Sequence, residues 1–312
     1  MTVQLQGGLI MEQQLFTNEI ILSWLQYFAK NTPIDLEKVK MLDITRKNKN
    51  VIPTVESRKA TLVFTEAGDQ DIFYRMWNAG LGECEVWYNE GDKPEGEIKH
   101  DLLKHMINRG INASAGMLII NENARNTYKI GMRNENFRRG SINYVGSEIR
   151  AVILNKMQVG QQDEICVISG ESIAIESAII ATDGTVIAVE YSGADRATME
   201  ENIEHFGLSN VCVIDHVDEE SMRDCPVPRL VFMVASASME QELDCLTKLN
   251  PEIDIVIYTL DFNVAANLTK LLEKYGVKDA EVIQVSVSTL NAKNSFVQQP
   301  APWIVSGKAD CR

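Results

Sequence analysis

Two polar stretches in the middle of the chain stand where a nucleotide-binding fold holds its ligand. Glu190 ends one β-branched run, and the turn Ser169-Gly170-Glu171 ends another. An acidic residue after the second strand of such a unit accepts hydrogen bonds from ribose hydroxyls. The turn after the first strand brings backbone close to the ligand, which favours glycine. These residues predict a cofactor site whose turn has only one glycine. The alternative for Glu190 is an exposed acid at a strand end.

The elements that must position these residues form a β-α-β unit. Residues 164–168 and 185–189 are short apolar runs typical of buried strands. The residues between them place an apolar stripe on one helix face: Ile173, Ile175, Ala178 and Ile179. Asp183-Gly184 is a turn pair that ends this helix. Such units build parallel sheets with right-handed crossovers, so the sequence predicts an α/β fold.

Composition limits the class of protein. The 312 residues are 45% hydrophobic and 24% charged, as expected for a globular chain long enough for two domains. A net charge of -14 argues against nucleic acid and against an anionic membrane surface. The six cysteines contain no C-x-x-C pair, so no metal site is expected. The chain start lacks a signal-peptide pattern, and no apolar run is long enough to span a membrane. A cytoplasmic protein with reduced thiols is therefore expected.

The pattern of apolar residues divides the chain into three regions. Residues 1–55 are expected to be a helical N-terminal extension, 56–140 a small α/β domain, and 141–312 a larger α/β domain. Several segments are assigned within these regions: helices over residues 36–42 and 98–108, a polar linker over 134–143, and one strand over 281–288. Because the last two strands have only a loop between them, an antiparallel strand is expected at the C-terminal end.

Specific stretches resemble a known family. GSEIRAVILNKM (146–157), DRATMEENIEHFGLSNVCVI (195–214) and EVIQVSVSTLNAKNSFVQQPAPWIVSG (281–307) resemble the decarboxylating precorrin-6Y C5,15-methyltransferases of corrin biosynthesis. Residues 60 to about 130 resemble the C-terminal half of the C5-methylating domain, a tetrapyrrole methylase, that is often fused upstream.

This resemblance implies a fold and a function. The fold would be the class I S-adenosylmethionine-dependent methyltransferase fold, a Rossmann-like doubly wound sheet with an antiparallel C-terminal strand, beside the smaller N-terminal α/β domain. The cofactor would be S-adenosylmethionine, the substrate a corrinoid tetrapyrrole precursor, and the assembly a homo-oligomer. The small domain lacks its usual partner half, so no active site of its own is expected.

The family's cofactor positions carry over incompletely. Its three motif glycines fall on Val167, Ser169 and Glu171, with Gly170 one place off, while Glu190 keeps the acidic ribose ligand. The run near the adenine falls on residues 215–217. The residues implied for cofactor binding are Ser169, Gly170, Glu171, Glu190, His216 and Val217. No catalytic residue and no metal ligand is assigned.

Three functions remain open. The chain is a divergent methyltransferase, a non-catalytic homologue that binds or scaffolds, or a fold adapted to another small anionic ligand. Side chains in the turn take up space that S-adenosylmethionine needs, so weak or absent cofactor binding is expected. His216 is an adenine neighbour, a general base or an exposed loop residue. Arg150 and the pair Arg138-Arg139 contact substrate carboxylates, or else lie on a helix surface and in a solvated linker, respectively.

Overall fold

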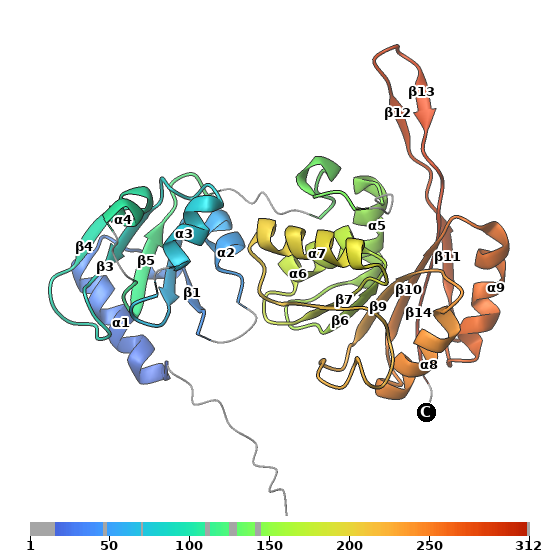
Figure 1. Ribbon diagram of the computed structural model, residues 1–312, viewed down its shortest axis with the longest axis horizontal. Helices are drawn as coiled ribbons and strands as arrows, with labels where there is room; N and C mark the ends of the chain where they lie inside the picture. The colour runs from blue at the N-terminus through green and yellow to red at the C-terminus, as the bar shows by residue number, and fades with distance from the viewer. Residues whose placement is uncertain are drawn as a thin grey trace, which may run out of the picture.

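A computed structural model describes residues 16–45, 49–69, 71–109, 113–124, 130–140 and 145–310. It contains two α/β bodies that lie side by side, each built around its own sheet (Figure 1). The helices are α1 (Asn18–Asn31), α2 (Val51–Ser57), α3 (Asp71–Asn78), α4 (Leu103–Arg109), α5 (Ser147–Met157), α6 (Glu171–Ile180), α7 (Gly193–Phe206), α8 (Met239–Leu249) and α9 (Phe262–Glu273). The strands of the small body are β1 (Val39–Asp43), β2 (Ala60–Phe64), β3 (Glu85–Tyr88), β4 (Lys99–Leu102) and β5 (Gly116–Ile120). Those of the large body are β6 (Ile165–Ile168), β7 (Val186–Val189), β8 (Val211–Ile214), β9 (Leu230–Val234), β10 (Asp254–Thr259), β11 (Glu281–Gln284), β12 (Ser288–Leu290), β13 (Phe296–Gln298) and β14 (Trp303–Lys308).

The large sheet confirms the architecture expected from the sequence. Its seven strands run in the order β11-β14-β10-β9-β6-β7-β8. Neighbouring strands from β10 to β8 are parallel, whereas β14 is antiparallel to both β10 and β11. The order reverses beside β6, the first strand of the β-α-β unit. Ligands of open α/β sheets bind outside the carboxyl ends of the strands at such a point.

Helices cover both faces of this sheet. Helices α5, α6 and α7 pack on one face, where apolar side chains such as Ile153, Ile175 and Met199 are fully buried. Helices α8 and α9 pack on the other through residues such as Leu246 and Leu272. Strands β6 and β7 are buried at every position. This burial explains why their sequences are continuous apolar runs and not alternating ones.

The segment expected as one strand over residues 281–288 is two strands in different sheets. Strand β11 ends at Gln284, and β12 then pairs with β13 in a separate hairpin that projects from the large body (Figure 1). The alternating pattern of this stretch predicts an extended backbone but cannot show that the chain leaves the sheet.

The small body has a mixed sheet in the order β1-β2-β5-β3-β4, in which only β1 and β2 are parallel. Helix α1 covers one face through Trp24 and Phe28, and α2, α3 and α4 cover the other. Of two helices expected here, the one over 36–42 is wrong, and the one over 98–108 is confirmed only from Leu103 onwards as α4. Residues 36–42 are a short 3₁₀ turn followed by β1, and residues 99–102 form β4. Pairing with β2 and with β3 overrides the helical pattern of these short segments. In the described part of the expected extension over residues 1–55, α1, β1 and α2 are thus part of the small body.

A buried polar contact joins the two bodies. The Asn50 side-chain amide, before α2, donates to the Ala178 carbonyl (3.2 Å) and to Oδ1 of Asn210 (2.9 Å). Its own oxygen accepts from the Ser209 backbone N–H at 2.8 Å. Ile52 packs against Gly207, where an added Cβ would lie 2.3 Å from its Cδ1. The position of α2 against the large body is therefore defined by both hydrogen bonds and close packing.

The stretch expected as a solvated linker packs against the large body in its described part. Met132 and Phe137 are buried in the core on the α5–α7 side. The Arg138 backbone N–H donates to Oδ1 of Asn202 at 2.8 Å, and its carbonyl accepts from the same amide at 3.1 Å. Residues 141–143 of the expected linker lie outside the described residues. Phe137 anchors the described part of the expected linker in the core, and Met132 anchors the residues just before it.

Candidate functional site

The turn after β6 is shaped by packing. Ser169 has a left-handed backbone (φ 56°), and Gly170 precedes the first residue of α6. A Cβ on Gly170 would lie 2.8 Å from carbon atoms of both Phe232 and Val167. Contacts this short are not tolerated, so glycine is needed at position 170 to pack over β9. The single glycine of the turn thus has a structural role in the core.

Three acidic side chains gather at the carboxyl ends of β6 and β7. Glu171 begins α6, Glu190 follows β7, and Asp195 lies in the first turn of α7. A Cβ on Gly140 would lie 3.1 Å from Oδ1 of Asp195 and 3.5 Å from Oε2 of Glu171, so this backbone adjoins both. We call Glu171, Glu190 and Asp195 the acidic cluster. Like charges brought together away from water favour the protonated form of a carboxyl group.

Glu190 is buried and not at the surface. Its side chain is 2% exposed, and its Oε2 has no hydrogen-bond partner among the described residues. Its backbone is fixed by the N–H to the Ile214 carbonyl (3.1 Å) and by Arg196 Nη1 on its own carbonyl (2.8 Å). Burial, with a further contribution from Glu171 and Asp195, raises the pKa of Glu190 to about 8. The alternative that Glu190 is an exposed acid at a strand end is therefore wrong.

Glu171 is held by a neighbouring helix. Its carboxylate accepts a hydrogen bond from Nδ2 of Asn202, a fully buried residue of α7. Burial raises the pKa of Glu171 to about 7, although the hydrogen bond from Asn202 opposes the shift. The Asn202 side chain also forms hydrogen bonds with the Arg138 backbone. One amide therefore holds both Glu171 and the segment that contains Arg138. The Glu171 carboxylate therefore already has a hydrogen-bond partner within the protein.

His216 and Val217, the other two residues predicted to bind the cofactor, contact residues outside the acidic cluster. His216 is exposed, with Nδ1 2.5 Å from Asp215 and Nε2 3.0 Å from Asp218 and 3.1 Å from Ser221, all in its own loop. The hydrogen bond with Asp215 is the main reason that the pKa of His216 is raised. Val217 packs against the core on the α8 and α9 side. These contacts favour the exposed-loop interpretation of His216.

Arg150 is also a structural residue. It is fully buried and forms an ion pair with Glu176, which is 2% exposed. Its Nη1 donates to the Val145 carbonyl at 2.8 Å, and its guanidinium carbon lies 4.7 Å from the centre of the Phe137 ring. Both earlier interpretations, a helix-surface ion pair and a substrate contact, are thus incorrect. The guanidinium instead fixes α5, α6 and the segment before α5 together.

Sequence reasoning missed several polar residues at this edge of the sheet: Tyr191, Asp195, Asn202 and Glu242. The Tyr191 hydroxyl donates to Glu242, which is 3% exposed and whose pKa burial raises to about 7. The sequence pattern could have identified two of these residues. Asp195 and Asn202 share the buried stripe of α7 with Met199 and Phe206, at helical spacing. A polar residue on such a stripe predicts a buried partner.

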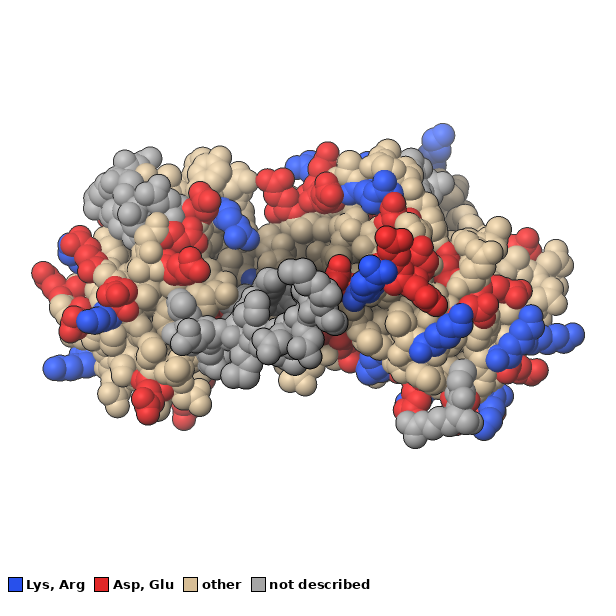
Figure 2. Space-filling view, turned by 60° about the horizontal axis from the view of Figure 1, so that its bottom comes forward, with Lys and Arg blue, Asp and Glu red and all other residues tan. Residues whose placement is uncertain are grey.

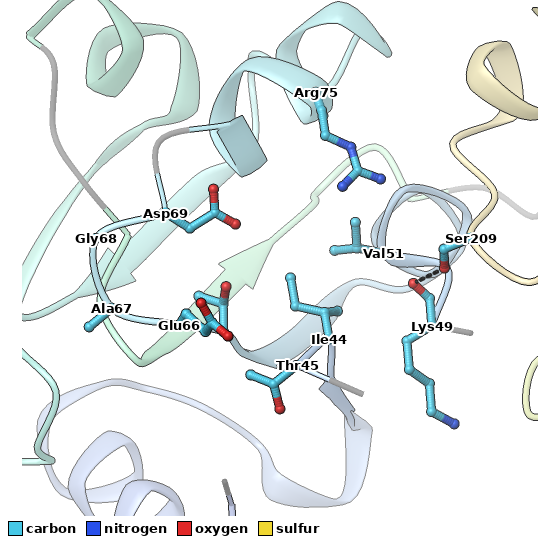
Figure 3. A pocket seen from close by; sticks show the side chains of 11 residues that line it. Ile44, Thr45, Lys49, Val51, Glu66, Ala67, Gly68, Asp69, Arg75 and Ser209 are labelled. Atoms are coloured by element: carbon cyan, nitrogen blue, oxygen red, sulfur yellow. Dashed lines mark hydrogen bonds between the residues drawn. The ribbon is translucent and has the colours of Figure 1, made fainter. Parts of the chain in front are cut away.

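The open cavities of the described residues lie between and within the bodies. Figure 2 shows the surface hollowed between the two lobes, with both acidic and basic side chains nearby. One cavity of about 740 Å³ lies beyond the carboxyl ends of β1 and β2. In Figure 3, Arg75 and Asp69 lie on opposite sides of it, and the Ser209 hydroxyl donates to the Lys49 carbonyl at its edge. A second cavity of about 930 Å³ separates α3 from α7 and is lined by Arg75, Arg138 and His205 together with three glutamates.

Two further features concern the described part of the chain. No group of three histidine, cysteine, aspartate or glutamate side chains there is arranged to hold a metal ion. Within the same residues, no helix combines the length and the apolar character needed to cross a membrane.

Comparison with known proteins identifies the large body. A family model described as the precorrin methyltransferase domain matches residues 141–301, which are 161 of the 312 residues. The precorrin-6y C5,15-methyltransferase of Geobacter metallireducens is 22% identical, with a TM-score of 0.52 over 57% of this chain and 97% of that one. The C-terminal domain of the Rhodobacter capsulatus precorrin-6Y C5,15-methyltransferase is 19% identical, with a TM-score of 0.47 over 58% and 98%.

No curated protein matches the chain. The Geobacter structure shows the shared fold, which is that of the class I methyltransferases. The family model covers more than half of the chain and includes the whole β-α-β unit with its acidic cluster. The family expected from residues 146–157, 195–214 and 281–307 is thereby confirmed. The chain belongs to the precorrin methyltransferase domain family, a family of cobalamin biosynthesis.

Proposed function

We propose that this chain is a member of the precorrin methyltransferase family that has kept the fold and lost tight binding of S-adenosylmethionine. One observation carries the proposal: Glu171, Glu190 and Asp195 gather where the methionine end and the ribose of the cofactor would lie. The cofactor carries a carboxylate at its methionine end. Any carboxyl group of the acidic cluster that is ionised would repel that charge, most strongly in a site with little water. Glu190, whose pKa is raised to about 8, adds to this repulsion only when it loses its proton.

The shape of the turn also opposes the cofactor. The region a ligand would approach is already in use, because Gly170 packs on Phe232 and Glu171 binds Asn202. Glu190, the expected partner of the ribose hydroxyls, is 2% exposed. A ligand would have to open these contacts before it could reach the carboxylate. The residues present do not fit the group, so we derive no methyl-transfer step.

A binding or scaffolding role towards a corrinoid precursor fits these features. The ligand class follows from the family and from a structural neighbour named as a precorrin-6y methyltransferase. Packing of the sheet is intact, with β6 and β7 fully buried. A protein that only binds needs the fold and not the cofactor turn.

Active methyl transfer to a corrinoid precursor is the second candidate. It is favoured by Glu190, which keeps the position of the family's ribose ligand at the end of β7. In that case the acidic cluster would rearrange on binding, and cofactor affinity would be ordinary despite the turn.

Calorimetric titration with S-adenosylmethionine and its demethylated product separates the candidates. We expect dissociation constants on the order of millimolar, since a few kcal/mol are lost and each 1.4 kcal/mol is about tenfold. Glu171→Gly should tighten binding and Glu190→Ala should abolish what remains. Glu220→Gly, the same kind of change at an exposed loop residue, is the matched control. Micromolar affinity of the unaltered protein would refute the proposal and support the enzyme.

A further inference from the structure

A small cavity at the junction of the two bodies differs in charge from the rest of the molecule. It has a volume of about 270 Å³. The small body and the residues leading into it contribute Lys40, Asn50, Pro53, Thr54, Ser57 and Arg58, and the large body contributes Gln161, Ile179 and Thr182. We call it the junction cavity. It is lined from both bodies, and it is separate from the acidic cluster.

The junction cavity carries positive charge only, as far as its described lining shows. Lys40 and Arg58 line it, and no aspartate or glutamate does. Four other cavities in the described parts of the chain each include at least one glutamate. The whole chain has 44 acidic and 30 basic residues. A cavity with two cations and no acid is therefore the reverse of what this composition favours.

Neither cation is used elsewhere in the described structure. Neighbouring lysines are paired, as Lys59 with Glu122 at 2.8 Å and Lys49 with Asp183. Lys40 and Arg58 form no such pair with a described residue. The hydroxyl groups of Thr54 and Ser57 both donate to carbonyls of their own helical segment at 2.7 Å. The side-chain donors left for a ligand are thus Lys40, Arg58, the Gln161 amide and the Thr182 hydroxyl.

The end of α6 would be the main electrostatic obstacle to an anion here, since helix carbonyls carry partial negative charge. Two of those carbonyls already accept hydrogen bonds from side chains. The Asn210 amide donates to Ala178 at 2.9 Å and to Ala181 at 2.8 Å, and Asn50 donates to Ala178 as well. The same two asparagines hold the walls of the cavity in place. Lys40 and Arg58 therefore line a cavity beside helix carbonyls that already accept hydrogen bonds from asparagine side chains.

We propose that the junction cavity is a binding site for a compact anion, a phosphate or a small carboxylate, held by Arg58, Lys40 and Gln161. A guanidinium matches the geometry of two oxygens of such a group, and an ammonium adds a point charge. Because the ligand contacts both bodies, its binding stabilises their arrangement by mass action. The site works whether or not S-adenosylmethionine binds at the acidic cluster.

The test is calorimetric titration of the full chain with inorganic phosphate and with citrate, at an ionic strength held constant with sodium chloride. We expect saturable binding of at least one anion to the unaltered protein. The double variant Lys40→Gln/Arg58→Gln should bind about tenfold or more weakly, because two charge-assisted hydrogen bonds are lost. The matched control is Lys278→Gln/Arg223→Gln, which removes the same charges outside the cavity at positions that are exposed, as Lys40 and Arg58 are. It should change affinity less than about twofold, since screened distant charges contribute little.

A second variant separates the site from general electrostatics. Gln161→Glu places a carboxylate in the cavity from the other body and should weaken anion binding as strongly as the double variant. Tighter phosphate binding assigns the site to phosphate groups, and tighter citrate binding assigns it to carboxylates. No saturation by either anion up to about 10 mM, which limits the binding free energy to less than about 3 kcal/mol, would overturn the proposal. Equal losses in the double variant and its control would overturn it too.

Discussion

At the scale of single residues, burial gives Glu190 properties that its position in the sequence does not show. Its carboxyl group lies among Glu171 and Asp195 with one oxygen lacking a described partner, and its pKa is raised to about 8. The folded protein therefore holds a proton that the unfolded chain releases at lower pH. An acidic residue at a nucleotide site usually binds the ligand as a carboxylate. Glu190 instead keeps its proton up to about pH 8.

This burial predicts a pH dependence of stability. A raised pKa in the folded state means that the contribution of Glu190 to stability is lost as pH rises from about 4.5, its ordinary value, through about 8. Each pKa unit corresponds to about 1.4 kcal/mol, so the change is on the order of a few kcal/mol. Glu190→Gln should remove this loss, and the variant should gain stability relative to the unaltered protein between pH 5 and pH 9.

Urea unfolding at the two pH values measures the effect. Glu220→Gln, at an exposed loop position, should follow the unaltered protein at both. A stability difference between Glu190→Gln and the unaltered protein that does not change with pH would contradict the assignment.

At the scale of elements, an ion pair in the core joins α5 to α6. Arg150 and Glu176 are 0% and 2% exposed, and Glu176 also accepts from the backbone N–H groups of Gly131 (2.6 Å) and Met132 (3.0 Å). The pair thus holds two helices and the segment before α5. Buried pairs of this kind are costly to break because the remaining charge has no partner.

Glu176→Gln should therefore lower the free energy of unfolding by about 3–5 kcal/mol. The matched control is Glu281→Gln, which removes the exposed pair between Lys156 and Glu281 and should cost less than about 1 kcal/mol. Chemical denaturation of both variants is the measurement. Equal, small losses would show that Arg150 finds other partners when Glu176 is neutral.

At the scale of the whole molecule, the β12–β13 hairpin has an apolar surface with no cover in a single chain. Phe296 is 76% exposed, Leu290 56% and Val297 50%, and the hairpin stands away from the large body (Figure 1). Leu290 and Phe296 are cross-strand partners, and exposed apolar side chains that lie together often mark an interface. This supports the homo-oligomer expected from the sequence, which stays a prediction.

We predict that the protein is oligomeric at micromolar concentration and that Phe296→Ser shifts it towards the monomer without unfolding it. The reason is that Phe296 lies on the hairpin and outside both cores. Leu22→Ser, a change at a 57% exposed position of α1, should leave the oligomer intact. Light scattering with circular dichroism on each variant is the check, and a monomeric unaltered protein would rule the interface out.

The sequence by itself determined the large sheet and the family. Short apolar runs such as those within 164–168 and 185–189 are typical of buried strands of a parallel sheet, and the helix-free link near the C-terminus predicts the antiparallel strand. Both are local signals, because the period and length of a run fix the element it forms. The positions of Ser169, Gly170, Glu171 and Glu190 at one edge of the sheet followed from that topology.

Only the tertiary structure decided what those residues do. Nothing in the sequence shows that Gly170 packs on Phe232 or that Asn202 binds Glu171, since the partners lie 62 and 31 positions apart. The same holds for the pairing with β2 that makes residues 39–43 the strand β1, and for the junction cavity formed by two bodies. Burial, ion pairing and cavity charge depend on contacts between distant segments, and such contacts exist only once the chain has folded.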